Sequence, residues 1–331
     1  MGSTLKSKLM IEYNDGIHLK GTGLWFDSKK KAGLSFISNA HVDKFTVPEK
    51  TIATPETVKF LEKKIRKSIV LSCPYYRPFT LGNLQVELVP SGHMLGSSQM
   101  VVDKGEKTLV YTGDLNLKKL PTTEVAYLKK CDVLVMKSTF GLPEYVFPTF
   151  EESIKPLTKF IEDAFSSHST PVILVEPMGI GQDIIKALGK NGFKISLHKS
   201  INNVTKIYED FGVNFGDYER LKSDNIEERV VIIPPDKIDS DDLNKIKSKR
   251  SAIIIESGRE DISSVKSQLK VDEVFTFSSL AGYNELLEYI EKVSPEKIYL
   301  VDRHANEFAK TLEKKGYQAI ALEKPTQLNL L

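Results

Sequence analysis

Four side chains in the first part of the chain are of the types that bind metal ions in hydrolases. His41 and Asp43 lie directly after an apolar run at residues 34–37, which predicts a buried strand. Such a pair can supply imidazole and carboxylate ligands to neighbouring ions. A distant histidine such as His93 can close one site, and a distant aspartate such as Asp114 can bridge both. The pattern therefore indicates metal-assisted hydrolysis as the chemistry to test.

The length and composition are those of a soluble protein with more than one core. The chain has 331 residues, so we expect one large domain with an insertion, or two domains. The formal net charge of +2 gives no general argument for nucleic-acid binding. Cys73 and Cys131 predict buried thiols in a reducing compartment. No apolar run reaches the length of a membrane span and the first residues lack a signal-peptide core, so we expect a cytoplasmic protein without a membrane partner.

The elements that must position these side chains change in kind near residue 145. The first part is strand-rich, whereas Thr149 and Glu152 form a capping-box signature that begins a series of alternating strands and helices. Such alternation predicts a parallel sheet with crossover helices. Strands are expected at residues 9–13, 23–26, 34–37, 68–71, 85–89, 99–102, 108–111, 133–136, 172–175, 194–197, 230–233, 253–255, 274–277, 298–301 and 318–322. Helices are expected from Pro55, from Phe150, and at residues 180–190, 202–211, 241–249, 283–293 and 304–315.

Four loops after strands carry the polar motifs. Residues 38–44 read S-N-A-H-V-D-K, residues 90–98 read P-S-G-H-M-L-G-S-S, residues 111–114 read Y-T-G-D, and residues 137–141 read K-S-T-F-G. In order and spacing they resemble the S-H-x-H-x-D-H, P-x-G-H-x-L-G-S, T-G-D and E-x-T-F-G motifs of the metallo-β-lactamase fold in its β-CASP nuclease branch. The group most similar is that of RNA 3′-end-processing factors and DNA-ligase-associated exonucleases. The resemblance covers nearly the whole chain.

The resemblance implies an α/β fold, an αββα metallo-β-lactamase sandwich with an inserted Rossmann-like β-CASP domain. Residues 1–145 would form the first part of the metallo-β-lactamase lobe, residues 146–278 the inserted domain, and residues 279–331 the segment that returns to the first lobe. In this architecture the substrate runs in the cleft between the two lobes.

Several positions depart from the family pattern. A histidine of the family is replaced at Asn39, Lys44, Leu280 and Asp302, and an acid is replaced at Lys137 and Ser279. For Asp302 the alignment is open, because His304 could be a displaced counterpart of the closing histidine. A lysine ammonium has no lone pair, so Lys44 and Lys137 cannot ligate an ion while protonated, and their charge repels a divalent cation.

The surviving ligands leave two cofactor alternatives. His41, His93 and Asp114 could hold one zinc ion with an open position for water. The second ion would have only Asp43 and Asp114, with Asp302 as a further candidate, so we expect no zinc or one zinc rather than two. The same side chains could instead order their loops through hydrogen bonds. In that case Asp43 and Asp114 are vestigial.

The first functional hypothesis is a catalytically inactive or severely impaired nuclease homologue. It would bind RNA or single-stranded DNA, or pair with an active β-CASP paralogue or another processing subunit, for example in mRNA 3′-end processing. The alternative is a metal-dependent exonuclease or endonuclease with a single ion, and a third is a structural subunit with neither metal nor nucleic acid. Candidate nucleic-acid contacts are Lys44, Lys118, Lys119 and Lys137.

Overall fold

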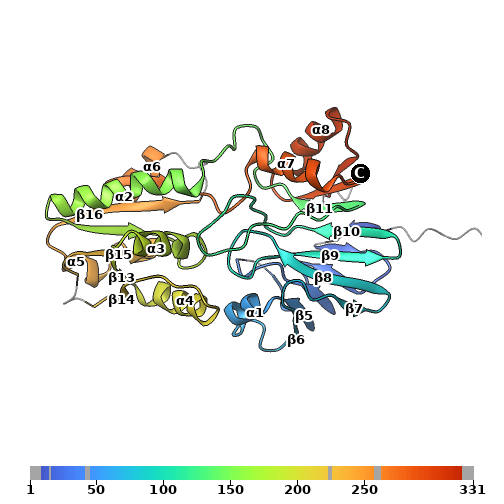
Figure 1. Ribbon diagram of the computed structural model, residues 1–331, viewed down its shortest axis with the longest axis horizontal. Coiled ribbons are helices and arrows are strands. Elements are labelled where there is room, and N and C mark those ends of the chain that lie inside the picture. The colour runs from blue at the N-terminus through green and yellow to red at the C-terminus, as the bar shows by residue number, and fades with distance from the viewer. Residues whose placement is uncertain (1–8, 15, 42–44, 223–225, 257–261, 323–331) are drawn as a thin grey trace, which may run out of the picture. The chain divides into compact units, whose positions relative to one another are not determined.

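The computed structural model describes residues 9–14, 16–41, 45–222, 226–256 and 262–322. The chain forms two compact units (Figure 1). The first comprises residues 1–117, 124–146 and 280–331, and the second comprises residues 118–123 and 147–279. The short segment 118–123 therefore belongs to the second unit, whereas the sequence placed it in the first lobe. The reason is local: Thr122 donates two hydrogen bonds to Asp183 of the second unit.

The first sheet of the first unit has the order β1-β2-β3-β4-β5-β6. Its strands are β1 (Ile11–Tyr13), β2 (Ile17–Leu19), β3 (Leu24–Phe26), β4 (Leu34–Phe36), β5 (Lys50–Ala53) and β6 (Ile69–Ser72). Pairing is antiparallel from β1 to β3 and parallel from β3 to β6. Helix α1 (Pro55–Leu61) connects β5 to β6, and the Thr54 hydroxyl accepts from the backbone N–H of Thr57 at its start.

Strand β6 is the edge strand of this sheet among the described strands. All of its residues are exposed, including Ile69 at 69%, Val70 at 36% and Leu71 at 47%. The strand follows a basic run at residues 63–67. The edge therefore combines backbone groups that no described strand pairs with apolar side chains open to solvent.

The second sheet of this unit has the order β19-β18-β11-β10-β9-β8-β7. The strands are β7 (Phe79–Leu81), β8 (Leu84–Pro90), β9 (Ser98–Lys104), β10 (Lys107–Tyr111), β11 (Val133–Lys137), β18 (Lys297–Val301) and β19 (Ala319–Ala321). Pairing is antiparallel from β7 to β10 and parallel from β10 to β19. The late strands β18 and β19 thus complete a sheet begun by the first part of the chain.

The core of the first unit lies between its two sheets. Phe26 and Phe36 of the first sheet meet Tyr111 of the second, with ring centroids 5.0 and 6.2 Å apart. On its other face the second sheet packs against α7 (Tyr283–Val293) and α8 (Ala305–Lys314), which bury Tyr289 and Phe308 among others. These layers confirm the expected αββα sandwich.

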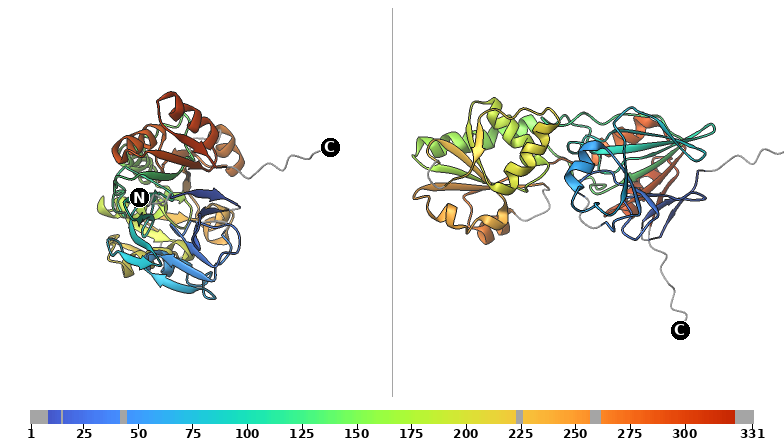
Figure 2. Two further views of the ribbon diagram at one scale, coloured as in Figure 1. Left: turned by 90° about the vertical axis from the view of Figure 1, so that its right-hand side faces the viewer. Right: turned by 90° about the horizontal axis from the view of Figure 1, so that it is seen from below.

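The second unit is a parallel sheet with helices on both faces. The strand order is β14 (Tyr218–Arg220), β13 (Lys194–Leu197), β15 (Arg229–Ile233), β12 (Thr170–Leu174), β16 (Lys249–Ile255) and β17 (Glu273–Thr276). Figure 2 shows helices α2 (Phe150–Ser166), α3 (Ile180–Lys190) and α4 (Lys199–Asp210) on one face. Helices α5 (Asp241–Asn244) and α6 (Ile262–Leu269) lie on the other, and a short 3₁₀ helix (Pro235–Lys237) precedes α5. The Rossmann-like pattern and the capping box of Thr149 and Glu152 are confirmed.

Some expected elements differ. The helix expected at residues 241–249 is wrong, because α5 ends at Asn244 and β16 already begins at Lys249. Leu243 and Ile246 mimic a helical stripe, yet they are buried in the core beside the sheet from a short turn. Strands β2, β5, β7 and β14 and helix α6 were not expected. No helix in the described part of the chain is long and apolar enough to cross a membrane.

Candidate active-site mouth

The motif loops meet at one edge of the first unit. Strands β8, β10, β11 and β18 all run in the same direction within the second sheet, so their carboxyl ends lie at one edge. The loops after them carry His93, Asp114, Lys137 and Asp302. Asn39 follows β4 of the facing sheet, and its side chain reaches Asp114. We call this set of loop residues the mouth.

A glycine allows the close approach of two of these loops. Gly113 has φ +56°, a left-handed conformation that favours glycine. A Cβ atom at this position would lie 2.5 Å from the Cβ atom of Ser38, closer than real contacts allow. The T-G-D loop therefore passes directly against the end of the facing sheet, which brings Asp114 beside Asn39.

Asp114 is bound by a cation and an amide rather than left open. Its Oδ2 atom accepts hydrogen bonds from Lys137 Nζ at 2.8 Å and from Asn39 Nδ2 at 2.9 Å. Burial alone would raise the pKa of the Asp114 carboxyl, but the charge of Lys137, with smaller contributions from His93 and from both hydrogen bonds, holds it well below its usual range. The aspartate is therefore a carboxylate paired with an ammonium group.

Lys137 sits between two acids. Besides Asp114, its Nζ atom lies 3.8 Å from Asp27 Oδ2. Burial would lower the pKa of Lys137, yet the opposing charges of Asp114 and Asp27 raise it above its ordinary value, so the side chain stays protonated. The charge that the family pattern would place here is thus reversed: an ammonium stands at the position of a glutamate.

Asp27 is a member of the mouth that the sequence did not indicate. Its carboxylate accepts from the Ser38 backbone N–H at 2.8 Å, the Ser38 hydroxyl at 2.6 Å and the Tyr111 hydroxyl at 2.7 Å. Burial, followed by the charge of Asp27, raises the pKa of Tyr111 well above its usual value, so this donor stays protonated. The only signal in the sequence was an aspartate after an apolar run, which is also typical of an ordinary turn.

The two mouth histidines face each other. His41 Nδ1 lies 3.0 Å from His93 Nε2, and the His41 backbone N–H donates to Asn39 Oδ1 at 2.8 Å. His93 is only 3% exposed, and its backbone N–H donates to Ser97 Oγ. Asn39, which replaces a family histidine, therefore orders the loop with both ends of its amide.

The donor set at the mouth is incomplete for a metal. Within the described residues, no three His, Cys, Asp or Glu side chains are grouped so that they could hold an ion. Asp43 and Lys44, two further residues of the motif, lie outside the described residues. The roles expected of these two stay predictions.

The late replaced positions have structural partners. Asp302 adopts a left-handed φ of +79°, and its Oδ2 accepts from the Thr139 hydroxyl at 2.6 Å. His304 stands at the start of α8, with its ring centroid 5.6 Å from that of Tyr145. In the second unit, buried Ser279 donates to Glu256 Oε1 at 2.6 Å, and Leu280 follows it as the first residue of the returning segment.

The lysine pair after the T-G-D motif belongs to the second unit. Lys118 Nζ donates to the carbonyl of Phe147 at 2.5 Å, so part of its hydrogen-bonding capacity is used within that unit. Lys119 is exposed. The expectation that both border the mouth stays a prediction.

Comparison with known proteins agrees with this architecture. Residues 264–322 match the family described as the Zn-dependent metallo-hydrolase RNA specificity domain. A probable DNA ligase of Opitutus terrae is 28% identical over 323 residues, which is 97% of this chain and 32% of that protein. RNase aCSPSF2 of Saccharolobus solfataricus is 23% identical over 72% of this chain and 56% of its own length.

The RNase J-like protein of Methanocaldococcus jannaschii is 22% identical over 65% of this chain and 62% of its own length. The chain belongs to the β-CASP branch of the metallo-β-lactamase family. This β-CASP chain spans about a third of the ligase and less than two thirds of the two ribonuclease relatives.

Proposed function

We propose that this β-CASP chain is a catalytically inactive or severely impaired nuclease homologue that acts in nucleic-acid processing as a binding or partner subunit. The observation that carries the proposal is the 2.8 Å contact between Lys137 Nζ and Asp114 Oδ2. In the family resemblance Asp114 is the carboxylate that would bridge two ions. Here a fixed ammonium takes the charge that an ion would bring.

The residues of the mouth fit a two-ion centre poorly. In two-metal hydrolysis one ion readies the attacking water and both stabilise the attacking and leaving oxygens. Lys137 is a monovalent donor without a coordination site, so it can hold a carboxylate or a phosphate oxygen but cannot activate water as a Lewis acid. We therefore propose that the mouth holds no zinc or one zinc, and that its polar groups chiefly order the motif loops.

Metal content of the purified full chain tests this proposal most directly. We expect fewer than two zinc equivalents per chain, measured by mass spectrometry of the metal, and no zinc- or manganese-dependent cleavage of RNA or single-stranded DNA. The triple substitution Asn39→His, Lys44→His and Lys137→Glu restores the family pattern and should raise zinc content, whereas Lys137→Arg keeps the positive charge and should not. Two zinc equivalents in the natural chain, with cleavage lost in His93→Ala, would overturn the inactive assignment.

One observation favours a second candidate function, a hydrolase with a single ion. The imidazoles of His41 and His93 are already within 3.0 Å of each other, so a small rotation could turn both toward one zinc ion with Asp114. One zinc equivalent, lost in His93→Ala together with a slow cleavage activity, would support this candidate. One equivalent without cleavage would leave the inactive assignment standing.

Nucleic-acid binding separates a binding subunit from a structural one. A binding subunit should hold a short RNA or single-stranded DNA at low salt, with an affinity that falls as salt rises because phosphate contacts release counterions. Lys119→Glu should weaken this binding, while Lys310→Glu on α8 of the other unit serves as the exposed control. Failure to bind at low salt, combined with a stable processing partner, would instead support the structural role.

A further inference from the structure

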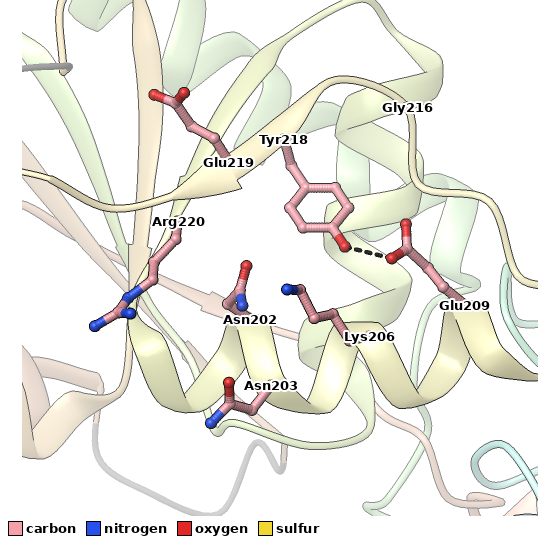
Figure 3. A pocket seen from close by; sticks show the side chains of 8 residues that line it. All are labelled: Asn202, Asn203, Lys206, Glu209, Gly216, Tyr218, Glu219 and Arg220. Carbon is pink, nitrogen blue, oxygen red and sulfur yellow. Dashed lines mark hydrogen bonds between the residues drawn. The ribbon is translucent and has the colours of Figure 1, made fainter.

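The second unit carries a pocket at the edge of its sheet, formed by α4 and β14 (Figure 3). Its volume is about 520 Å³, within the size range of small-molecule sites. The lining residues are Asn202, Asn203, Lys206, Glu209, Gly216, Tyr218, Glu219 and Arg220. None of them belongs to the mouth, and β14 is the last strand of the sheet in the described part of the chain.

Two cations of this pocket have no acidic partner among the described residues, whereas its two acids are engaged. Glu209 Oε2 accepts from the Tyr218 hydroxyl at 2.6 Å. Glu219 Oε1 lies 3.2 Å from Nε of Arg229, whose side chain is 14% exposed. Lys206 and Arg220 form no ion pair with the residues that the structure describes. The pocket therefore offers positive charge that is not neutralised locally.

Asn202 is a buried polar group that lines the same pocket. It is 5% exposed, and its side-chain amide forms no hydrogen bond within the described part of the chain. A buried amide without partners costs free energy, and a ligand that bonds to it would recover that loss. Asn202 and Lys206 are four residues apart on α4, so they lie on one face of the helix.

Tyr218 adds an aromatic face that is held in place. Its hydrogen bond to Glu209 anchors the ring from the side of α4, and Figure 3 shows the ring beside the Lys206 side chain and near the Asn202 amide. An aromatic ring provides a stacking surface for a base, while lysine and arginine bind phosphate oxygens and an amide bonds to a base edge or a sugar hydroxyl. All three kinds of contact converge on one pocket.

We propose that this pocket binds a phosphate-bearing nucleotide, either free or as the terminal nucleotide of a single strand. Lys206 and Arg220 hold the phosphate, Tyr218 stacks on the base, and Asn202 bonds to the base edge or the sugar. The site is separate from the mouth, so it does not depend on whether the mouth binds metal or cleaves nucleic acid.

Isothermal titration of the full chain tests the proposal with adenosine 5′-monophosphate, adenosine and inorganic phosphate as probes. The monophosphate should bind and adenosine should bind at least about tenfold more weakly, since the charge-assisted contacts are lost. Lys206→Glu and Arg220→Glu should each weaken monophosphate binding by about tenfold or more, and Asn202→Ala should weaken it less. The matched control is Lys190→Glu, an exposed lysine on α3 of the same unit that does not line the pocket.

Short oligonucleotides identify the source of the nucleotide. Tighter binding of a 5′- or 3′-phosphorylated strand than of the same strand with hydroxyl ends, lost in Lys206→Glu, supports a strand terminus. Tighter binding of the monophosphate than of either strand supports a free nucleotide. Equal binding of adenosine and its monophosphate, or binding unchanged in both Lys206→Glu and Arg220→Glu while thermal unfolding shows folded variants, would overturn the proposal.

Discussion

Two aspartates, one in each compact unit, are shifted in opposite directions by their surroundings. Burial raises the pKa of both, but at Asp114 the ammonium of Lys137 reverses the effect and lowers the value below its usual range. At Asp183, in the first turn of α3, burial dominates and the pKa is raised to about 7. The hydrogen bonds from Thr122 oppose that rise without cancelling it.

The comparison shows what a neighbouring cation changes. Both carboxylates accept two short hydrogen bonds, so hydrogen bonding does not explain the difference. Asp114 has an ammonium at 2.8 Å, whereas no ammonium lies within ion-pair distance of Asp183 among the described residues. The mouth is therefore an internally neutralised site, and a change in its lysine should have larger consequences than any change around Asp183.

The largest effect is expected for Lys137→Met. This change leaves the Asp114 and Asp27 carboxylates without their shared cation, and breaking one side of a buried pair costs about 3–5 kcal/mol at pH 7. Because the folded-state pKa of Asp114 is depressed, its stabilising contribution is present above the unfolded pKa and is lost as pH falls through the folded value. Urea unfolding at neutral and acidic pH should show the gap between variant and natural chain shrinking in acid.

The control for this variant is Lys292→Met, since Lys292 pairs with Glu288 on the surface of α7. An exposed pair contributes little, so this change should leave the unfolding free energy nearly unchanged. Equal stability of Lys137→Met and Lys292→Met would show that the mouth pair is not a stabilising unit.

An intermediate effect of opposite sign is expected for Asp183→Asn. The raised folded pKa means that the unfolded chain gives up its proton between about pH 4 and pH 7 while the folded chain keeps it, so this group lowers stability as pH rises through that window. The neutral amide removes this slope and should stabilise the chain by about 2 kcal/mol at pH 8, with no gain near pH 4. Asp114→Asn, which strands Lys137, should destabilise instead. Two variants of the same sign at pH 8 would contradict the comparison.

The smallest effect is expected for Thr122→Val. The change keeps the shape of the side chain and the backbone donor to Asp183 but removes the hydroxyl donor at 2.7 Å, which should cost about 1 kcal/mol. Because that hydroxyl lowers the pKa of Asp183, its loss should raise the value further, measurable by carbon NMR of the aspartate carboxyl. Thr123→Val, at the neighbouring position, serves as the control. A lower Asp183 pKa in Thr122→Val would contradict the assigned role.

Much of the fold and part of the mouth could be predicted from the sequence because their signals are local. Motif spacing placed Asp114 near Asn39 and Lys137, and helical periodicity gave α3 and α7 their observed bounds. Strand β14 was missed since its residues, Tyr-Glu-Arg, show no apolar alternation. The expected helix at residues 241–249 failed because two apolar residues at helical spacing also fit a buried turn.

The partners of the polar groups could not be predicted in the same way. Asp27 and Asp183 look like turn and helix-start aspartates in the sequence, and only the fold decides that one joins the mouth and the other is buried to 1% exposure. The same holds for the pocket beside α4, whose residues come from an expected helix and an unexpected strand.

The exposed edge at β6 will govern how the purified protein behaves when it is concentrated. Two copies that align these strands would continue the sheet across molecules and cover Ile69, Val70 and Leu71 at once. The basic run at residues 63–67 repels a second copy, but that repulsion weakens within a Debye length of about 3 Å in molar salt. High ionic strength, a common choice for removing bound nucleic acid, is therefore the condition in which this chain should associate most readily with itself.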